Sequence, residues 1–236
     1  MGNAQIFYRE CKKICSERIK GLGFKAYKMH YYRVIDKSVQ MFCFYAYGGR
    51  REVRFDIRPL GHQYMSREWE GEVWLNDFVP DLDVEILLAD NDIESTERYF
   101  AQKICDALEN IILSGFEMIR TTEDAYCLKR FWLENCMLKH SVSTKYIYED
   151  YMWYLQLGQY EKAKNLLLRD IDVWKRENNI VSEQDITDEN DMIIYRNLMR
   201  PVHQWCEKDD KEIEKEIKRL ETQNLEILKW KNELQM

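Results

Sequence analysis

Proline and glycine are scarce in this chain, with 3 prolines and 9 glycines in 236 residues. Such a composition excludes long Pro- or Gly-rich linkers and low-complexity segments. Hydrophobic residues make up 45% of the chain, which is enough for a sizeable buried core in one or two domains. No apolar run approaches the roughly 20 residues that a membrane-spanning helix needs, so we predict no membrane partner.

Motifs of the familiar catalytic classes are missing as well. The chain has no phosphate-binding glycine loop, no His-Glu-x-x-His, no Gly-x-Ser-x-Gly and no Cys-x-x-Cys. Seven cysteines, an odd number without paired spacing, favour reduced thiols and a cytoplasmic location. We predict no cofactor and no catalytic residue, and we keep an enzyme of unrecognised type as an open alternative.

Two pairs of candidate metal ligands have the helical spacing of four, namely Cys11 with Cys15 and Cys136 with His140. A zinc site needs four ligands, and neither pair is accompanied by a second one. The first pair also lies on the apolar stripe of an expected helix, where a thiol behaves as a small hydrophobic side chain. We therefore interpret these cysteines as core residues and predict no metal site.

The strongest structural signal lies between Lys28 and Arg58, where three strand-like runs follow one another. The last run, residues 51–58, alternates apolar and charged residues with the period of a half-buried strand. Gly48-Gly49 before it suits a tight hairpin turn, because glycine adopts positive φ without steric cost. This hairpin sets Phe42 opposite Phe55 and predicts an antiparallel meander.

The two faces of this meander differ in character. One face should be core beneath the N-terminal helix, and it collects Met29, Tyr31, Phe42, Phe44, Val53, Phe55 and Ile57. The reverse face mixes polar and apolar side chains, and it carries His30, Tyr32, Met41, Cys43, Tyr45, Arg54 and Arg58. We expect that the reverse face is either covered by the C-terminal helices or used to bind a ligand.

Helical periodicity dominates the rest of the chain. We predict helices over residues 3–20, 92–114, 121–140, 188–208 and 209–236, with Gly115 ending the second and Pro201 kinking or breaking the fourth. Short strands are expected near residues 72–75 and 82–86. The fold class is therefore α+β: an N-terminal helix and an antiparallel meander sheet of three to five strands over residues 1–90, and a helical region over residues 91–236.

Two stretches of the helical region point to helix–helix packing. Residues 145–178 are expected to form one helical hairpin. Within them, residues 153–163 resemble the helix-turn-helix junction of a tetratricopeptide repeat, with Gly158 at the turn and Ala163 at the close contact. The segment Asp209–Met236 has a heptad seam, formed by Ile213, Ile217, Leu220, Asn224, Ile227, Lys231 and Leu234. This seam either packs on its own chain or forms a homodimer.

The N-terminal residues also carry a family resemblance. Gly23-Phe24, Tyr31-Tyr32-Arg33 and Val39-Gln40-Met41-Phe42, following an N-terminal helix, resemble an uncharacterised bacterial family over roughly residues 4–60. That resemblance implies no activity, because the family has none established. Small acidic bacterial proteins of similar build include immunity proteins, which supplies an analogy for function only.

Charge is divided unevenly along the chain. Residues 1–67 contain 14 Lys/Arg and 5 Asp/Glu, or +9, and residues 68–236 contain the remaining 21 and 37, or −16, for the net −7. Either the basic part docks on the acidic part, or each meets a partner of opposite charge. A protein-interaction module, immunity-like or regulatory, is the main hypothesis, and a nucleic-acid-binding module is the alternative. The candidate binding surface comprises Tyr32, Tyr45, Arg50, Arg51, Arg54 and Arg58.

Overall fold

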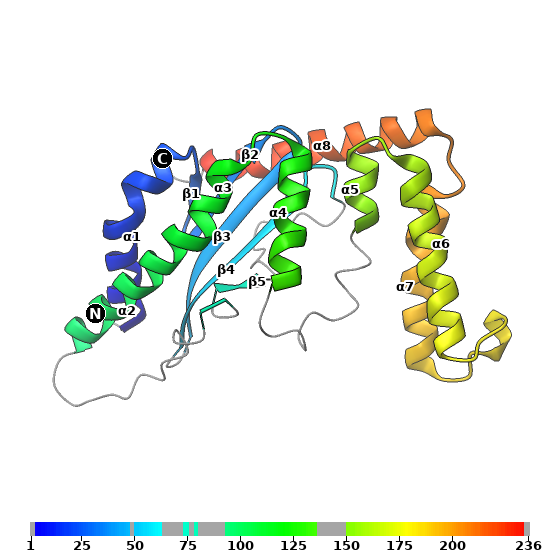
Figure 1. Ribbon diagram of the computed structural model, residues 1–236, viewed down its shortest axis with the longest axis horizontal. Coiled ribbons are helices and arrows are strands. Elements are labelled where there is room, and N and C mark those ends of the chain that lie inside the picture. Colours follow the sequence, from blue (N-terminus) through cyan, green and yellow to red (C-terminus); the bar gives the residue numbers. More distant parts are fainter. Residues whose placement is uncertain are drawn as a thin grey trace. The chain divides into compact units, whose positions relative to one another are not determined.

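The computed structural model describes residues 3–47, 50–62, 73–75, 78–79, 93–135 and 150–233 (Figure 1). These residues form an N-terminal helix, an antiparallel sheet and a helical C-terminal half, which confirms the predicted α+β class. Among the described helices, none is both long enough and apolar enough to cross a bilayer.

The first part of the chain, over its described residues, consists of one helix followed by five strands. Its elements are α1 (Asn3–Gly21), β1 (Lys25–Tyr27), β2 (His30–Ile35), β3 (Ser38–Tyr47), β4 (Arg50–Pro59) and β5 (Val73–Trp74). The second part is helical, with η3 a π-helix and η5 a 3-10 helix. Its elements are α2 (Ile93–Ala107), η3 (Leu108–Leu113), α3 (Ser114–Met118), α4 (Thr122–Asn135), α5 (Asp150–Gln156), α6 (Tyr160–Glu177), η5 (Glu183–Asp185), α7 (Glu189–Trp205) and α8 (Asp210–Glu233).

The chain divides into two compact units. Unit 1 comprises Met1–Leu60, Tyr64–Ser141 and Asn224–Met236, and unit 2 comprises Gly61–Gln63 and Val142–Gln223. This partition differs from a division at residue 90, because α2 packs on α1 and α4 packs on β4 within unit 1. The helix α8 contributes residues to both units.

The sheet of unit 1 has the strand order β1-β2-β3-β4-β5, and every described pairing is antiparallel. The predicted register is confirmed, since Phe42 lies opposite Phe55 and also opposite Tyr31. The strand β1 was not predicted. It is separated from β2 by a turn at Lys28, whose φ of 54° ends the extended run. The Gly48-Gly49 turn and the strand expected at residues 82–86 lie outside the described residues.

Helices cover the apolar face of the sheet (Figure 1). Aromatic rings contribute to the contact. Phe7 of α1 packs edge-on against Phe44, with ring centroids 6.3 Å apart. Trp132 of α4 packs edge-on against Phe55 at 4.8 Å. Such edge-to-face pairs stabilise the core beyond the free energy of burial alone. The prediction that the N-terminal helix covers this face is therefore confirmed.

Gly115 does not end a helix, which corrects the prediction. The helical segment continues through η3 and α3 to Met118. A Cβ atom at Gly115 would lie 3.0 Å from Trp132 and 3.3 Å from Leu128. The glycine therefore serves the close approach of α4 rather than a helix cap.

The last part of α8 packs on the reverse face of the sheet within unit 1. Leu228 lies in an apolar cluster with Tyr32, Val39, Met41 and Leu60. The Tyr32 hydroxyl donates a hydrogen bond to the Leu228 carbonyl at 2.5 Å, and burial raises the pKa of Tyr32 to about 12. This face was expected either to be covered by the C-terminal helices or to bind a ligand. At these residues it is covered by α8.

The heptad seam of α8 is used within the chain. Ile213, Ile217 and Leu220 lie in the core of unit 2, and Asn224 donates a hydrogen bond from Nδ2 to the Leu60 carbonyl at 2.6 Å. Leu228, rather than the predicted Ile227, is the next buried residue. A straight α-helix has 3.6 residues per turn, so its buried face drifts away from a 3.5-residue heptad repeat.

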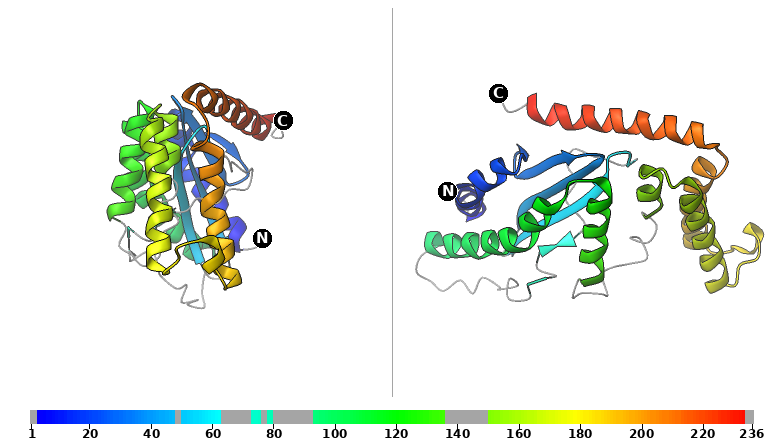
Figure 2. Two further views of the ribbon diagram at one scale, coloured as in Figure 1. Left: turned by 90° about the vertical axis from the view of Figure 1, so that its right-hand side faces the viewer. Right: turned by 45° about the horizontal axis from the view of Figure 1, so that its top comes forward.

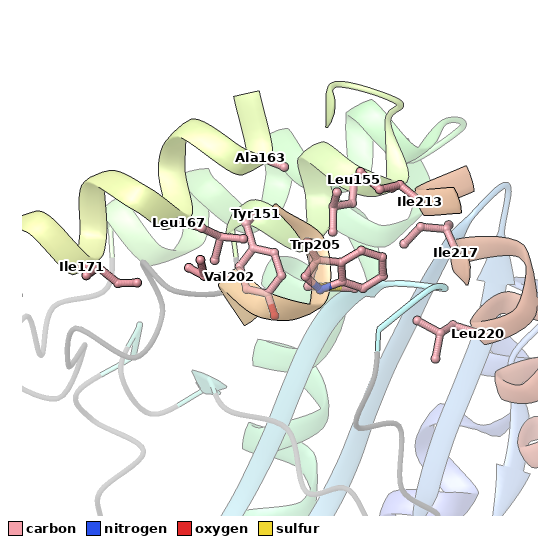
Figure 3. Packing of buried hydrophobic residues seen from close by; sticks show 11 residues of the cluster. Tyr151, Leu155, Ala163, Leu167, Ile171, Val202, Trp205, Ile213, Ile217 and Leu220 are labelled. Carbon is pink, nitrogen blue, oxygen red and sulfur yellow. The ribbon is translucent and has the colours of Figure 1, made fainter. Parts of the chain in front are cut away.

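Unit 2 is built around the predicted helical hairpin of α5 and α6. Gly158 adopts a φ of 72° at the turn, and Ala163 is fully buried where the helices approach. Side chains from α5, α6, α7 and α8 converge around the fully buried Trp205 (Figure 3). The helix α7 continues through Pro201 to Trp205, so the proline does not break it.

Candidate functional site

The predicted binding surface on the sheet is largely internal. Tyr32, Arg51 and Arg58 are buried, Tyr45 and Arg54 are half-buried, and Arg50 is exposed. Side chains on both faces of β4 are represented, because Arg51 and Arg54 are three positions apart and successive side chains of a strand alternate between its faces. The structure therefore does not bring the six residues together on one exposed surface.

Arg51 is committed to a buried ion pair. Its Nε donates to Glu97 Oε2 at 2.9 Å and its Nη2 donates to Glu97 Oε1 at 2.5 Å. The two side chains are 3% and 2% exposed, and the guanidinium also lies 5.6 Å from the centre of the Phe7 ring. This two-point geometry is the strong form of an arginine–carboxylate pair, and it joins β4 to α2.

Arg58 belongs to a second buried ionic group. The fully buried Asp56 carboxylate lies 3.3 Å from Arg58 Nε and 2.6 Å from Lys129 Nζ of α4. Burying these charges is unfavourable unless each has an opposite charge nearby, and the group supplies it. The lysine was not singled out from the sequence, because its partner lies 73 residues earlier in the chain.

Arg54 and Arg50 complete the predicted set. The Arg54 guanidinium stacks 4.4 Å from the centre of the Tyr45 ring, and its Nε lies 3.4 Å from Glu52 Oε2. Only Arg50 of the predicted arginines is exposed. The other three predicted arginines therefore have partners within unit 1 and are buried or half-buried.

Arg33, which was not predicted as a site residue, is a buried cation near two helix ends. Its Nε donates to Gln40 Oε1 at 2.6 Å and its Nη1 donates to the Leu22 carbonyl at 2.7 Å, while Nη2 donates to the Phe116 carbonyl. Desolvation by burial lowers the pKa of Arg33. Those carbonyls follow α1 and lie in α3, where the helix dipole favours a positive charge.

Buried thiols gather between α1 and α2. Cys11, Cys15 and Cys105 are at most 6% exposed, and Cys105 Sγ lies 3.9 Å from the Cys11 carbonyl. Hydrogen bonding between the Cys15 and Cys105 thiols, with burial, raises the pKa of Cys15. A protonated thiol is a poor metal ligand. Within the described ranges, no group of three His, Cys, Asp or Glu side chains is arranged to hold a metal ion.

A different surface stands out in unit 2, at the end where α6 connects to α7 (Figure 1, yellow). We call residues 177–195 the acidic end. It contains no Lys, Arg or His and six acidic residues, namely Glu177, Glu183, Asp185, Asp188, Glu189 and Asp191. Its local charge is therefore −6, against −7 for the whole chain.

Large aliphatic side chains are exposed on the same segment. Val181 is 88% exposed, Ile193 50% and Ile194 43%. Scattered exposed hydrophobic residues are common on protein surfaces. Here, however, three of the four exposed large hydrophobic residues in the described part of unit 2 fall within 19 residues, and the fourth is Leu168.

The acidic end is a folded structure rather than a loose loop. Beneath it, Trp174, Ile180, Ile186 and Tyr195 form a small buried cluster. The Trp174 and Tyr195 rings lie 5.9 Å apart and join α6 to α7, which run side by side in both figures (Figures 1 and 2). The exposed side chains are thus presented on a preformed surface.

Two of the six carboxylates stabilise this local structure. Asp185 accepts hydrogen bonds from the backbone N–H groups of Val181 and Ser182, and these bonds lower its pKa. Asp188 caps α7 by accepting from the N–H groups of Asn190 and Asp191.

The other four acidic residues have a different environment. They are Glu177, Glu183, Glu189 and Asp191. None of their side chains forms an ion pair or a hydrogen bond with another described residue. Negative charge near the start of α7 is favoured by the helix dipole, which accounts for Glu189 and Asp191 in part. Their charge remains available to a partner.

The sequence contained a usable signal for this surface. Residues 177–195 lack any basic residue and include the adjacent pair Ile193-Ile194, and both features can be read from the sequence. The helix predicted over residues 188–208 includes both isoleucines, but its periodicity alone does not show that they are exposed. The side chains that pack are Tyr195, Val202 and Trp205.

Comparison with protein-family models, curated proteins and solved structures finds no match for this chain. The resemblance of the N-terminal residues to an uncharacterised bacterial family therefore stays a prediction.

Proposed function

We propose that this protein is a non-enzymatic interaction module that binds a protein partner through the acidic end of unit 2. The observation that carries the proposal is the coincidence of exposed aliphatic side chains with unpaired carboxylates on one folded segment. An immunity-like or regulatory role in the bacterial cytoplasm is the form of this function that we favour.

Affinity capture from the native host tests this function. We expect the full chain to retain a partner, and we expect the variant I193S/I194S to lose it, because truncated aliphatic side chains no longer bury apolar area. The control is Leu168→Ser, which removes an aliphatic side chain of similar exposure from α6. Equal recovery by all three proteins, or no partner for any of them, would contradict the proposal.

Nucleic-acid binding is the second candidate. The observation that favours it concerns basic residues of α1 rather than those of the sheet. Arg9, Lys12, Lys13 and Lys20 are exposed and lie within one arc of this helix. An electrophoretic shift at about 50 mM salt, where phosphate contacts are strong, checks this candidate. Loss of the shift in a variant with Lys12, Lys13 and Lys20 changed to Gln would support it.

A further inference from the structure

We infer that the partner surface is basic and apolar: an amphipathic segment of a protein that presents Lys or Arg beside aliphatic side chains. This inference rests on the proposed function and adds the chemistry of the partner. The whole chain otherwise offers no motif that names a ligand.

Charge supplies the first step. The acidic end has a local charge of −6, and four of its carboxylates have no cation partner among the described residues. Exposed charges act over about 10 Å at 0.1 M salt, so their fields overlap along a segment of this size. Such a surface attracts cations and repels phosphate backbones and anionic lipid headgroups.

Placement of the aliphatic residues supplies the second step. On an α-helix, residues three or four apart share a face, so Glu189 adjoins Ile193 and Asp191 adjoins Ile194. A partner that contacts the two isoleucines therefore comes within reach of both carboxylates. Inorganic cations would be satisfied by the carboxylates alone and leave the isoleucines in water.

Neighbouring cations set the limits of the surface. Arg176 precedes the acidic end and Arg196 follows it, and Lys175 Nζ lies 5.7 Å from the centre of the Tyr195 ring. The favourable field for a cation is therefore confined to the segment between them. A basic segment should contact the connection and the first two turns of α7, and no more of the helix.

A defined probe tests this chemistry with the full-length protein. We would titrate a synthetic helical peptide of leucine and lysine in an amphipathic pattern, followed by fluorescence anisotropy and by amide shifts of the labelled protein. A peptide in which glutamate replaces lysine serves as the charge-reversed probe. We expect saturable binding of the lysine peptide alone, with shifts centred on residues 177–195 and weaker binding at higher salt.

Charge variants locate the effect. The variant E183Q/E189Q/D191N removes three unpaired carboxylates and leaves the capping residues Asp185 and Asp188 intact. We expect it to weaken binding of the lysine peptide about tenfold, as three charge contacts at the surface together imply. The control E17Q/E123Q/D172N removes three exposed carboxylates elsewhere and should change the affinity less than about threefold.

The outcomes separate this inference from the proposed function. Equal affinity of the two variants, stronger binding of the glutamate peptide, or no saturable binding would each overturn the basic partner. The proposed function would still stand if a captured host protein required Ile193 and Ile194. If capture of the host protein did not depend on Ile193 and Ile194, the proposed function itself would be contradicted.

Discussion

Units 1 and 2 differ in where they keep their charges. Unit 1 buries charged side chains in its core, among the described residues Glu10, Arg33, Arg51, Glu52, Asp56, Arg58, Glu97 and Lys129. In the described part of unit 2, Asp170 is the only buried Asp, Glu, Lys or Arg. Ion pairs between segments that are distant in the sequence join the sheet of unit 1 to its helices. The charges of unit 2 stay at the surface, where a partner can reach them.

The largest expected effect would come from breaking a charge pair in unit 1. Arg51→Ala leaves the Glu97 carboxylate buried without its cation, and we expect the free energy of unfolding to fall by about 3–5 kcal/mol. Urea denaturation measures this. The surface control Lys218→Ala breaks a pair with Glu214 whose side chains are 65% and 53% exposed, and it should lower the free energy of unfolding far less.

Truncation of the core in unit 2 provides the matching test. Trp205→Ala removes a fully buried ring, and about 3–5 kcal/mol of stability should be lost through cavity formation. A loss for Arg51→Ala that stayed below 1 kcal/mol, beside a full loss for Trp205→Ala, would show that the ionic core of unit 1 is not a stabilising device.

A smaller effect is expected at the polar contact of α8. Asn224→Ala leaves the Leu60 carbonyl without its side-chain donor, which should cost about 1–3 kcal/mol. Thr222→Ala is the matched control, because its hydroxyl bonds within the same helix and is exposed. Thermal unfolding of both variants, with equal shifts in Tm, would contradict a special role for Asn224.

Next comes the cap of α4. Asp36 accepts hydrogen bonds from the backbone N–H and the hydroxyl of Thr122, and these bonds lower its pKa below the ordinary 3.8. Its contribution is therefore present above pH 3.8 and is lost as the pH falls through the lowered pKa in the folded state. Asp36→Ala should cost about 1 kcal/mol at pH 7 and progressively less in acid, as urea denaturation at several pH values can show.

The smallest effect should have the opposite sign. Burial raises the pKa of Asp170, so the folded state of unit 2 favours the protonated carboxyl. Stability contributed by this group is present below its ordinary pKa of 3.8 and is lost as the pH rises through the raised pKa. Asp170→Asn should therefore raise Tm at pH 7 and leave it unchanged at about pH 3.5. A lower Tm at pH 7 would contradict this assignment.

Local sequence patterns predicted much of unit 1. Alternating residues in β3 and β4 determine which side chains face the core, so the register with Phe42 opposite Phe55 could be read from the letters. The same patterns could not show that Arg51 meets Glu97, because 46 residues separate them. An arginine on a strand looks the same in sequence whether it is exposed or paired inside.

The burial of most of the predicted site residues could not be read from the sequence for a related reason. Positive charge in the meander drew attention to arginines, yet an arginine between aromatic residues is often an internal donor. In unit 2, Ile193 and Ile194 fit a helical stripe, and only the structure shows that Tyr195 is buried while its two neighbours are exposed. Adjacent apolar residues on a helix cannot all face the core, and the sequence does not show which of them is buried.

Photo-crosslinking in the native host compares the two units most directly. A benzophenone amino acid would replace Val181 of unit 2 or Tyr47 of unit 1, which are 88% and 74% exposed. We predict a covalent adduct with a basic protein from position 181 and none from position 47. An adduct from position 47 alone, or the same adduct in equal yield from both positions, would contradict an interaction surface at the acidic end.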